Sequence, residues 1–159
     1  MLLAMFMNSA CGVYSFTGAS VSPDVKSIRI GLLENTSGFA LPTISQKLTE
    51  SLKSKILNST NLTISTEASD LDISGSITAI SVNPLAIQGN QQSLQNRLEI
   101  SVNINFVNSK NDKQNFEKVF KRYGDFASNK TLDQVQNTLL EQISQDLVQD
   151  IFNAAFINW

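Results

Sequence analysis

The chain has 159 residues, of which 42% are hydrophobic and only 16% are charged, and its net charge is −2. This length fits one domain with a sizeable core, and the near-neutral charge excludes a basic protein that attracts nucleic acid electrostatically. Because histidine is absent and Cys11 is the only cysteine, a Cys/His zinc cluster, a Cys–His dyad and an intramolecular disulfide are also excluded.

The first feature along the chain is the apolar run MLLAMFM, followed by NSACG. This arrangement resembles the lipobox of bacterial lipoprotein signal peptides, in which the cysteine receives a diacylglycerol and becomes the new amino terminus. Ser9 and Ala10 fit that pattern, whereas Asn8 departs from it and no Lys or Arg precedes Cys11. The alternative is a buried free thiol. We expect residues 1–10 to be a signal peptide, 11–24 a lipidated tether and 25–159 a single domain.

A strand and a helix are predicted next. Apolar and polar residues alternate within Val25–Leu33, which is typical of a strand. A helix is predicted from about Pro42 to Leu57, with a capping box formed by Thr43 and Gln46. Four apolar residues recur at four-residue spacing along it and predict its buried face: Ile44, Leu48, Leu52 and Ile56.

Two long strands are predicted in the middle of the chain. Asp70–Asn83 alternates but slips in phase at Ala79, which predicts a β-bulge there. Arg97–Val107 alternates without interruption, and its polar face carries Ser101, Asn103 and Asn105 among other residues. The remaining predicted elements are a short extended segment at Leu62 and Ile64, a loop over Pro84–Gln95, a turn over Asn108–Lys113 and a return strand over Gln114–Phe126.

A helix of about 25 residues is predicted after Thr131, which forms a second capping box with Gln134. Both predicted helices carry one apolar stripe, and the central strands have one apolar and one polar face. These patterns predict an α+β two-layer sandwich, with two amphipathic helices packed on one face of a roughly four-stranded mixed or antiparallel sheet. The polar face of the sheet is expected to be open to water or to a partner.

Four segments together resemble the LptE family of lipopolysaccharide-assembly lipoproteins in its Bacteroidetes form: CGVYSFTGASVSPDVKSI, LAIQGNQQSLQNRLEISVNINFVN, NFEKVFKRYGDF and DIFNAAFINW. The resemblance implies a lipoprotein anchored in the inner leaflet of the outer membrane and facing the periplasm. It also implies a complex with an LptD-type β-barrel, in which the family member is a plug and assembly subunit that binds lipopolysaccharide in transit.

Basic residues lie beside aromatic residues in the return strand. Lys118, Lys121 and Arg122 suit the phosphates of lipid A, and the neighbouring phenylalanines suit its acyl chains. Alternation places Lys121 on the opposite face from the other two, so an ordinary solvated strand face is the alternative. These residues are the candidate lipopolysaccharide contacts.

The loop between the two long strands is the candidate partner contact. Ile87, Gln88 and Asn90 lie in it, and amides of this kind can pair with the polar inner side chains of a barrel wall. An ordinary strand connection is the alternative. Asp146 and Asp150 lie one helical turn apart and are expected on a solvated helix face rather than in a metal site.

These features favour a subunit of lipopolysaccharide export that is not an enzyme and needs no cofactor beyond the covalent lipid. The alternative function is a stand-alone periplasmic lipoprotein that binds lipid or glycan. Neither function involves nucleic acid.

Overall fold

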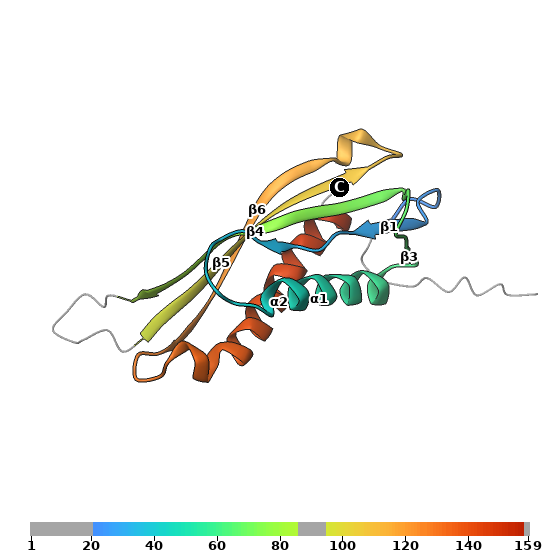
Figure 1. Ribbon diagram of the computed structural model, residues 1–159. Helices are drawn as coiled ribbons and strands as arrows, with labels where there is room; N and C mark the ends of the chain where they lie inside the picture. The colour runs from blue at the N-terminus through green and yellow to red at the C-terminus, as the bar shows by residue number, and fades with distance from the viewer. Residues whose placement is uncertain (1–20, 86–94, 158–159) are drawn as a thin grey trace, which may run out of the picture.

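The computed structural model describes residues 21–85 and 95–157, and in this part of the chain two long helices lie against one face of a six-stranded sheet (Figure 1). The order of elements is β1 (Ser27–Ile30), β2 (Glu34–Asn35), α1 (Ile44–Ser59), β3 (Thr63–Ile64), β4 (Leu71–Pro84), β5 (Gln95–Asn108), the 3₁₀ turn η1 (Asp112–Gln114), β6 (Phe116–Ala127) and α2 (Leu132–Phe156).

The sheet is mixed. Its strand order is β3-β1-β4-β5-β6, with β2 also paired to β4. The short strand β1 is parallel to both β3 and β4, and α1 lies on the connection from β1 to β3, as a parallel pair requires. β4, β5 and β6 form an antiparallel meander. The α+β sandwich is confirmed. The sheet has six strands instead of about four, and two of the six, β2 and β3, have only two residues each.

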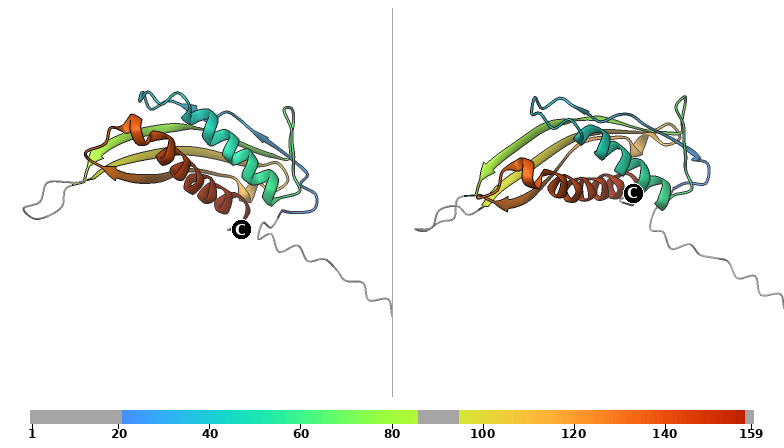
Figure 2. Two further views of the ribbon diagram at one scale, coloured as in Figure 1. Left: turned by 90° about the horizontal axis from the view of Figure 1, so that it is seen from below. Right: turned by 60° about the horizontal axis from the view of Figure 1, so that its bottom comes forward.

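The helices bury the apolar stripes that the sequence predicts. Figure 2 shows α1 and α2 along the same face of the sheet, and the interior between the layers is built from aliphatic residues and phenylalanines. Fully buried examples come from every layer: Ile44, Leu48, Leu52 and Ile56 in α1, Ile143 and Leu147 in α2, and Leu98, Ile100 and Val102 in β5. The other face, called the open face below, carries the alternate residues of the strands.

The predicted bulge is confirmed. The register between β4 and β5 shifts between Ile77 and Ala79, so Ile80 can return to the helix-covered side.

The two predicted capping boxes have different outcomes. The side chain of Gln134 accepts the backbone N–H of Thr131 at 3.0 Å, as expected. The box at the start of α1 is wrong, because the Thr43 side chain makes no cap hydrogen bond and the Gln46 amide instead donates to Glu50 at 2.8 Å. An i,i+4 pair on the helix surface has taken the place of the cap.

Candidate functional site

The open face is covered by side chains that pair across neighbouring strands. Lys121 of β6 lies 3.1 Å from Glu99 of β5. Four residues further along the same two strands, the Asn103 amide donates to Glu117 at 2.8 Å. On the same face, further from β6, Arg29 of β1 pairs with Asp72 of β4. These cross-strand pairs hold the polar side chains in fixed positions on the face.

Arg97 and Asp125 form the most elaborate of these pairs. The guanidinium donates twice to the carboxylate, at 2.7 and 2.8 Å, and also lies 3.6 Å from the centre of the Tyr123 ring. The hydrogen bonds from Arg97 lower the pKa of Asp125, and those to Asp125 raise the pKa of Arg97. Charges therefore dominate this end of the face, and Tyr123 is half exposed beside them.

The three polar residues that the sequence assigned to this face differ in exposure. Asn105 is exposed and Asn103 is partly buried, whereas Ser101 is only 7% exposed. The residue opposite Ser101 on β6 is Lys121, whose long side chain is paired with Glu99. The open face is therefore polar, as expected, and it carries ion pairs as well as amides.

The three candidate basic residues on β6 do not form one patch. Lys118 and Arg122 are on the helix-covered side of the sheet and Lys121 is on the open face, as strand alternation predicts. Arg122 donates to Asp150 of α2 at 2.6 and 2.7 Å, and these bonds and the charge of Asp150 raise the pKa of Arg122. Two of the three cations are thus already paired with carboxylates of the same chain.

Lys118 differs from the other two because no carboxylate within residues 21–85 and 95–157 pairs with it. Its ammonium lies 5.3 Å from the centre of the Phe120 ring. It lines a shallow groove of about 370 Å³ between β6 and α2, together with Phe120, Asp150, Asn153 and other residues. This groove therefore presents an available cation next to an aromatic side chain.

A row of aromatic rings continues from this groove. Phe116 lies between Phe120, whose ring centroid is 6.4 Å away, and Phe106, whose ring is stacked at 5.3 Å. Phe156 at the end of α2 packs edge-on against Phe106. The row is mostly buried, and only Phe116 is partly accessible beside Lys118. A ligand with an anionic head and an apolar tail matches this arrangement.

The pairing of Asp150 is a site feature that the sequence pattern missed. Asp150 was expected on a solvated helix face with Asp146, but it receives both hydrogen bonds of the Arg122 fork. Arg122 and Asp150 are 28 positions apart, and nothing in the local pattern of β6 or α2 signals the contact.

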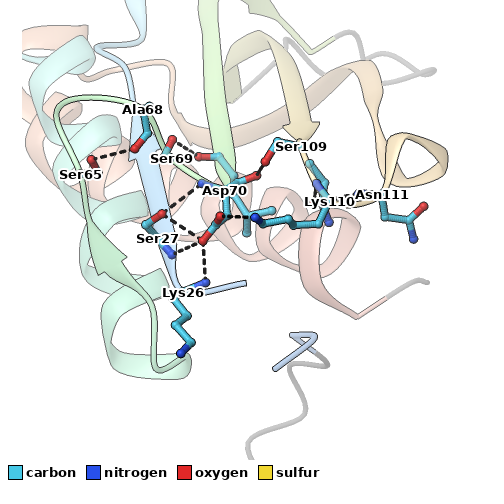
Figure 3. A network of polar contacts seen from close by, with 11 residues as sticks. Lys26, Ser27, Ser65, Ala68, Ser69, Asp70, Ser109, Lys110 and Asn111 are labelled. Atoms are coloured by element: carbon cyan, nitrogen blue, oxygen red, sulfur yellow. Dashed lines mark hydrogen bonds and ion pairs between the residues drawn. The ribbon is translucent and has the colours of Figure 1, made fainter. Parts of the chain in front are cut away.

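A second missed feature is a polar network where β1 begins (Figure 3). One carboxylate oxygen of Asp70 accepts hydrogen bonds from the backbone N–H groups of Lys26 and Ser27, at 2.9 and 3.1 Å. Lys110, from the turn after β5, lies 3.3 Å from the other oxygen. These bonds, led by the two backbone donors, lower the pKa of Asp70 to about 2.

The described residues contain no group of three or more His, Cys, Asp or Glu side chains that could hold a metal ion. Among the described helices, none is both long and apolar enough to cross a bilayer. Cys11 and the loop residues Ile87, Gln88 and Asn90 lie outside the described residues.

The fold and these surfaces define a class: within residues 21–85 and 95–157, the chain is an α+β module with one helix-covered and one open sheet face. The chain belongs to the LptE family of lipopolysaccharide-assembly proteins, whose model matches residues 25–155. Lipopolysaccharide assembly is a process of the Gram-negative envelope, so membership of this family assigns the chain a general role there.

Two solved structures have the same fold. A minor lipoprotein from Acinetobacter baumannii superposes with a TM-score of 0.54 at 15% identity, covering 81% of this chain and 91% of that one. Lipoprotein B from Nitrosomonas europaea superposes with a TM-score of 0.51, also at 15% identity, covering 80% of each chain. A search of curated proteins finds no match. At this identity the two structures support the fold alone.

Proposed function

We propose that this chain is an outer-membrane lipoprotein that pairs with an LptD-type β-barrel as a plug and assembly subunit, and that it helps to deliver lipopolysaccharide to the outer leaflet. The observation that carries the proposal is the match to the lipopolysaccharide-assembly family, which extends over almost the whole described domain. The role involves binding and assembly, with no catalytic step.

Acyl chains on Cys11 would anchor the domain in the inner leaflet of the outer membrane. The support is the apolar run and the small residues ahead of Cys11 in the sequence. Two or three acyl chains give stable membrane attachment where a single chain is marginal. Residues 11–24 would then tether the domain close to the membrane in which its barrel partner resides.

The barrel wall would meet the open face and the loop that contains Ile87, Gln88 and Asn90. The interior of a large membrane barrel is polar, so a plug needs polar surfaces. The ion-paired face of β4, β5 and β6 supplies such a surface, and its fixed cross-strand pairs limit the entropy lost on docking.

Lipopolysaccharide would bind along the helix-covered side of β6, with Lys118 as the main cation. A phosphate group requires a donor that is not already neutralised, and Lys121 and Arg122 are both paired within the chain. Phe116 and Phe120 flank Lys118, and the partly accessible Phe116 offers apolar contact to an acyl chain. Lys121 and Arg122 then act by positioning β6, Lys121 through its ion pair with Glu99 of β5 and Arg122 through its ion pair with Asp150 of α2.

The proposal is tested by purifying the tagged full chain from detergent-extracted outer membranes of its native cell. A large β-barrel protein in stoichiometric amount is the expected companion. A lipoprotein that purifies alone would refute the plug role and would support the alternative, a stand-alone periplasmic lipoprotein that binds lipid or glycan.

The anchor is tested separately. Cys11→Ala should abolish labelling by a clickable fatty acid and should release the chain from membranes, whereas Ser15→Ala should retain both properties. Continued labelling of the Cys11→Ala variant would refute lipid attachment at this residue.

A further inference from the structure

Asp70, which lies just before β4, bonds to two distant parts of the chain, the start of β1 and the turn after β5 (Figure 3). The Asp70 carboxylate accepts the backbone N–H groups of Lys26 and Ser27, and it also accepts the Ser27 hydroxyl at 3.1 Å. The Ser27 Oγ in turn accepts the N–H of Asp70 at 3.0 Å. The carbonyl of Asp70 accepts both the N–H and the hydroxyl of Ser109, each at 2.9 Å. Asp70 therefore links the start of β1, the start of β4 and the turn after β5.

β1 depends on such help because it is short and lies between two strands. It has four residues, and only three of them have partners in the register with β4. Its pairing with β3 covers two residues. Ile28 and Ile30 are buried in the core, but the strand has no long ladder of hydrogen bonds of its own. A short strand of this kind is expected to be among the first parts of a sheet to open.

The position of β1 gives this network its importance. The N-terminal part of the chain joins the sheet there, through a turn in which the N–H of Val25 donates to Ser22 at 3.0 Å. Tension on the N-terminal segment reaches the turn at Ser22 and the buried side chain of Val25 first. The next groups along the chain are the backbone N–H groups of Lys26 and Ser27, which the Asp70 carboxylate holds, and they receive the tension before the rest of the sheet does.

We infer that Asp70 is a latch that holds β1 in the sheet and fixes the point at which the N-terminal segment leaves the domain. The latch transmits tension from that segment to β4 and to the β5–β6 hairpin, instead of letting β1 peel away. The inference concerns the domain itself, and only the source of the tension, a lipid at Cys11, rests on the proposed function.

The charge state of Asp70 makes the latch permanent rather than switchable. A carboxylate with a pKa of about 2 remains almost fully ionised above about pH 4. Lys110 adds a cation on the far side of the same carboxylate. Removal of the side chain, not acidification, is therefore the perturbation that opens the latch.

Hydrogen–deuterium exchange of the full chain in detergent tests the inference. In Asp70→Ala, peptides that cover β1 should exchange at least about tenfold faster, while those from the centre of β5 remain unchanged. The matched control is Asp125→Ala, which removes another ion-paired carboxylate with a lowered pKa but leaves every bond to β1 intact. In this control the exchange of β1 should equal that of the wild type.

Two results would overturn the latch: unchanged exchange of β1 in Asp70→Ala, or an equal acceleration of β1 and β5. If Asp70→Ala does not fold, Ser27→Ala, which removes the hydroxyl that both donates to and accepts from Asp70, decides on the same comparison of β1 with β5. Because the measurement involves no partner, its outcome is independent of whether a β-barrel co-purifies with the chain.

Discussion

At the scale of single residues, the partner of a charged side chain decides whether that side chain is available to a ligand. Arg122 and Lys121 are bound to Asp150 and Glu99, whereas Lys118 lies against an aromatic ring. An arginine fork on a carboxylate is satisfied in both geometry and charge. A lysine ammonium over a ring retains donors for an incoming anion.

This difference predicts an unequal effect of two substitutions on the same strand. Lys118→Ala should reduce the lipopolysaccharide that co-purifies with the chain by about three- to tenfold, because one charge-assisted contact is lost. Lys121→Ala, which removes a cation already neutralised by Glu99, is the matched control and should have a smaller effect. The measurement is the amount of lipid A per protein by mass spectrometry, and equal losses in the two variants would contradict the assignment.

Two buried hydroxyls on the helices should respond to substitution in opposite directions. Ser144 of α2 is fully buried, and its Oγ has no hydrogen-bond partner among the described residues. Thr49 of α1 is 3% exposed, and its hydroxyl donates to Ser45 at 2.7 Å and accepts the N–H of Leu33 at 3.0 Å. An unsatisfied buried hydroxyl costs free energy, whereas a satisfied one contributes to stability.

We therefore expect Ser144→Ala to raise the free energy of unfolding by about 0.5–1 kcal/mol and Thr49→Val to lower it by about 1–2 kcal/mol. Urea denaturation followed by circular dichroism measures both changes. A destabilised Ser144→Ala variant would mean that the hydroxyl fills space or bonds in a way that the geometry does not include.

At the scale of elements, Gly75 of β4 leaves no room for a side chain next to β5. A Cβ atom built there would lie 2.1 Å from the carbonyl oxygen of Asn103, a distance that backbone atoms cannot relieve without separating the strands. Gly75→Ala should therefore lower the free energy of unfolding by about 2–3 kcal/mol. Gly31→Ala is the control, because its Cβ would meet Ile73 at an ordinary 3.7 Å. Equal melting temperatures for the two variants would contradict this account.

The elements themselves could be predicted where a local pattern determines them. The stripe of α2 and the alternation of β5 recur over many residues, so both elements are found at nearly their predicted bounds. The bulge near Ala79 was visible because a slip of one residue changes which side chains face the core. These features depend on sequence neighbours only.

The remaining features depend on contacts between distant residues. β2 consists of Glu34 and Asn35, which are extended because they pair with β4, and a strand of two residues is too short to show an alternating pattern in the sequence. The pairing of Arg122 with Asp150, and that of Asp70 with the start of β1, join elements that are close only after folding. The candidate site on β6 was therefore found by composition. Only the tertiary structure shows that, of its three cations, Lys118 is the one without a carboxylate partner among the described residues.

At the scale of the whole molecule, the domain is long in one direction. The start of β1 and the end of α1 lie at one end of the domain, and the end of β4 and the start of β5 lie at the other (Figure 1). β4 has 14 residues and so extends about 45 Å, which exceeds the roughly 30 Å hydrocarbon thickness of a bilayer. A body of this length can contact a barrel wall over the full depth of the membrane, as the proposed plug role requires.

At pH 8 and below, the stability of the whole domain should depend on pH in the acid range only. Asp70, Asp125 and Glu141 have pKa values lowered by their partners, namely the backbone N–H groups of β1, Arg97 and Lys47. Because folding lowers these values, the unfolded chain binds more protons between the two sets of pKa values, and stability decreases as the pH falls through that window. For Asp70 the window extends from its ordinary value near 4 down to about 2.

Histidine is absent, so apart from the single cysteine no side chain with an ordinary pKa changes charge between pH 6 and pH 8. We expect the urea midpoint to be constant from pH 6 to pH 8 and to fall below about pH 4. Asp70→Asn should start from a lower midpoint and show a shallower acid decline, because the group that loses its charge is already gone. A midpoint that falls between pH 7 and pH 5 would contradict this view, since it would require a titrating group that the described ion pairs do not supply.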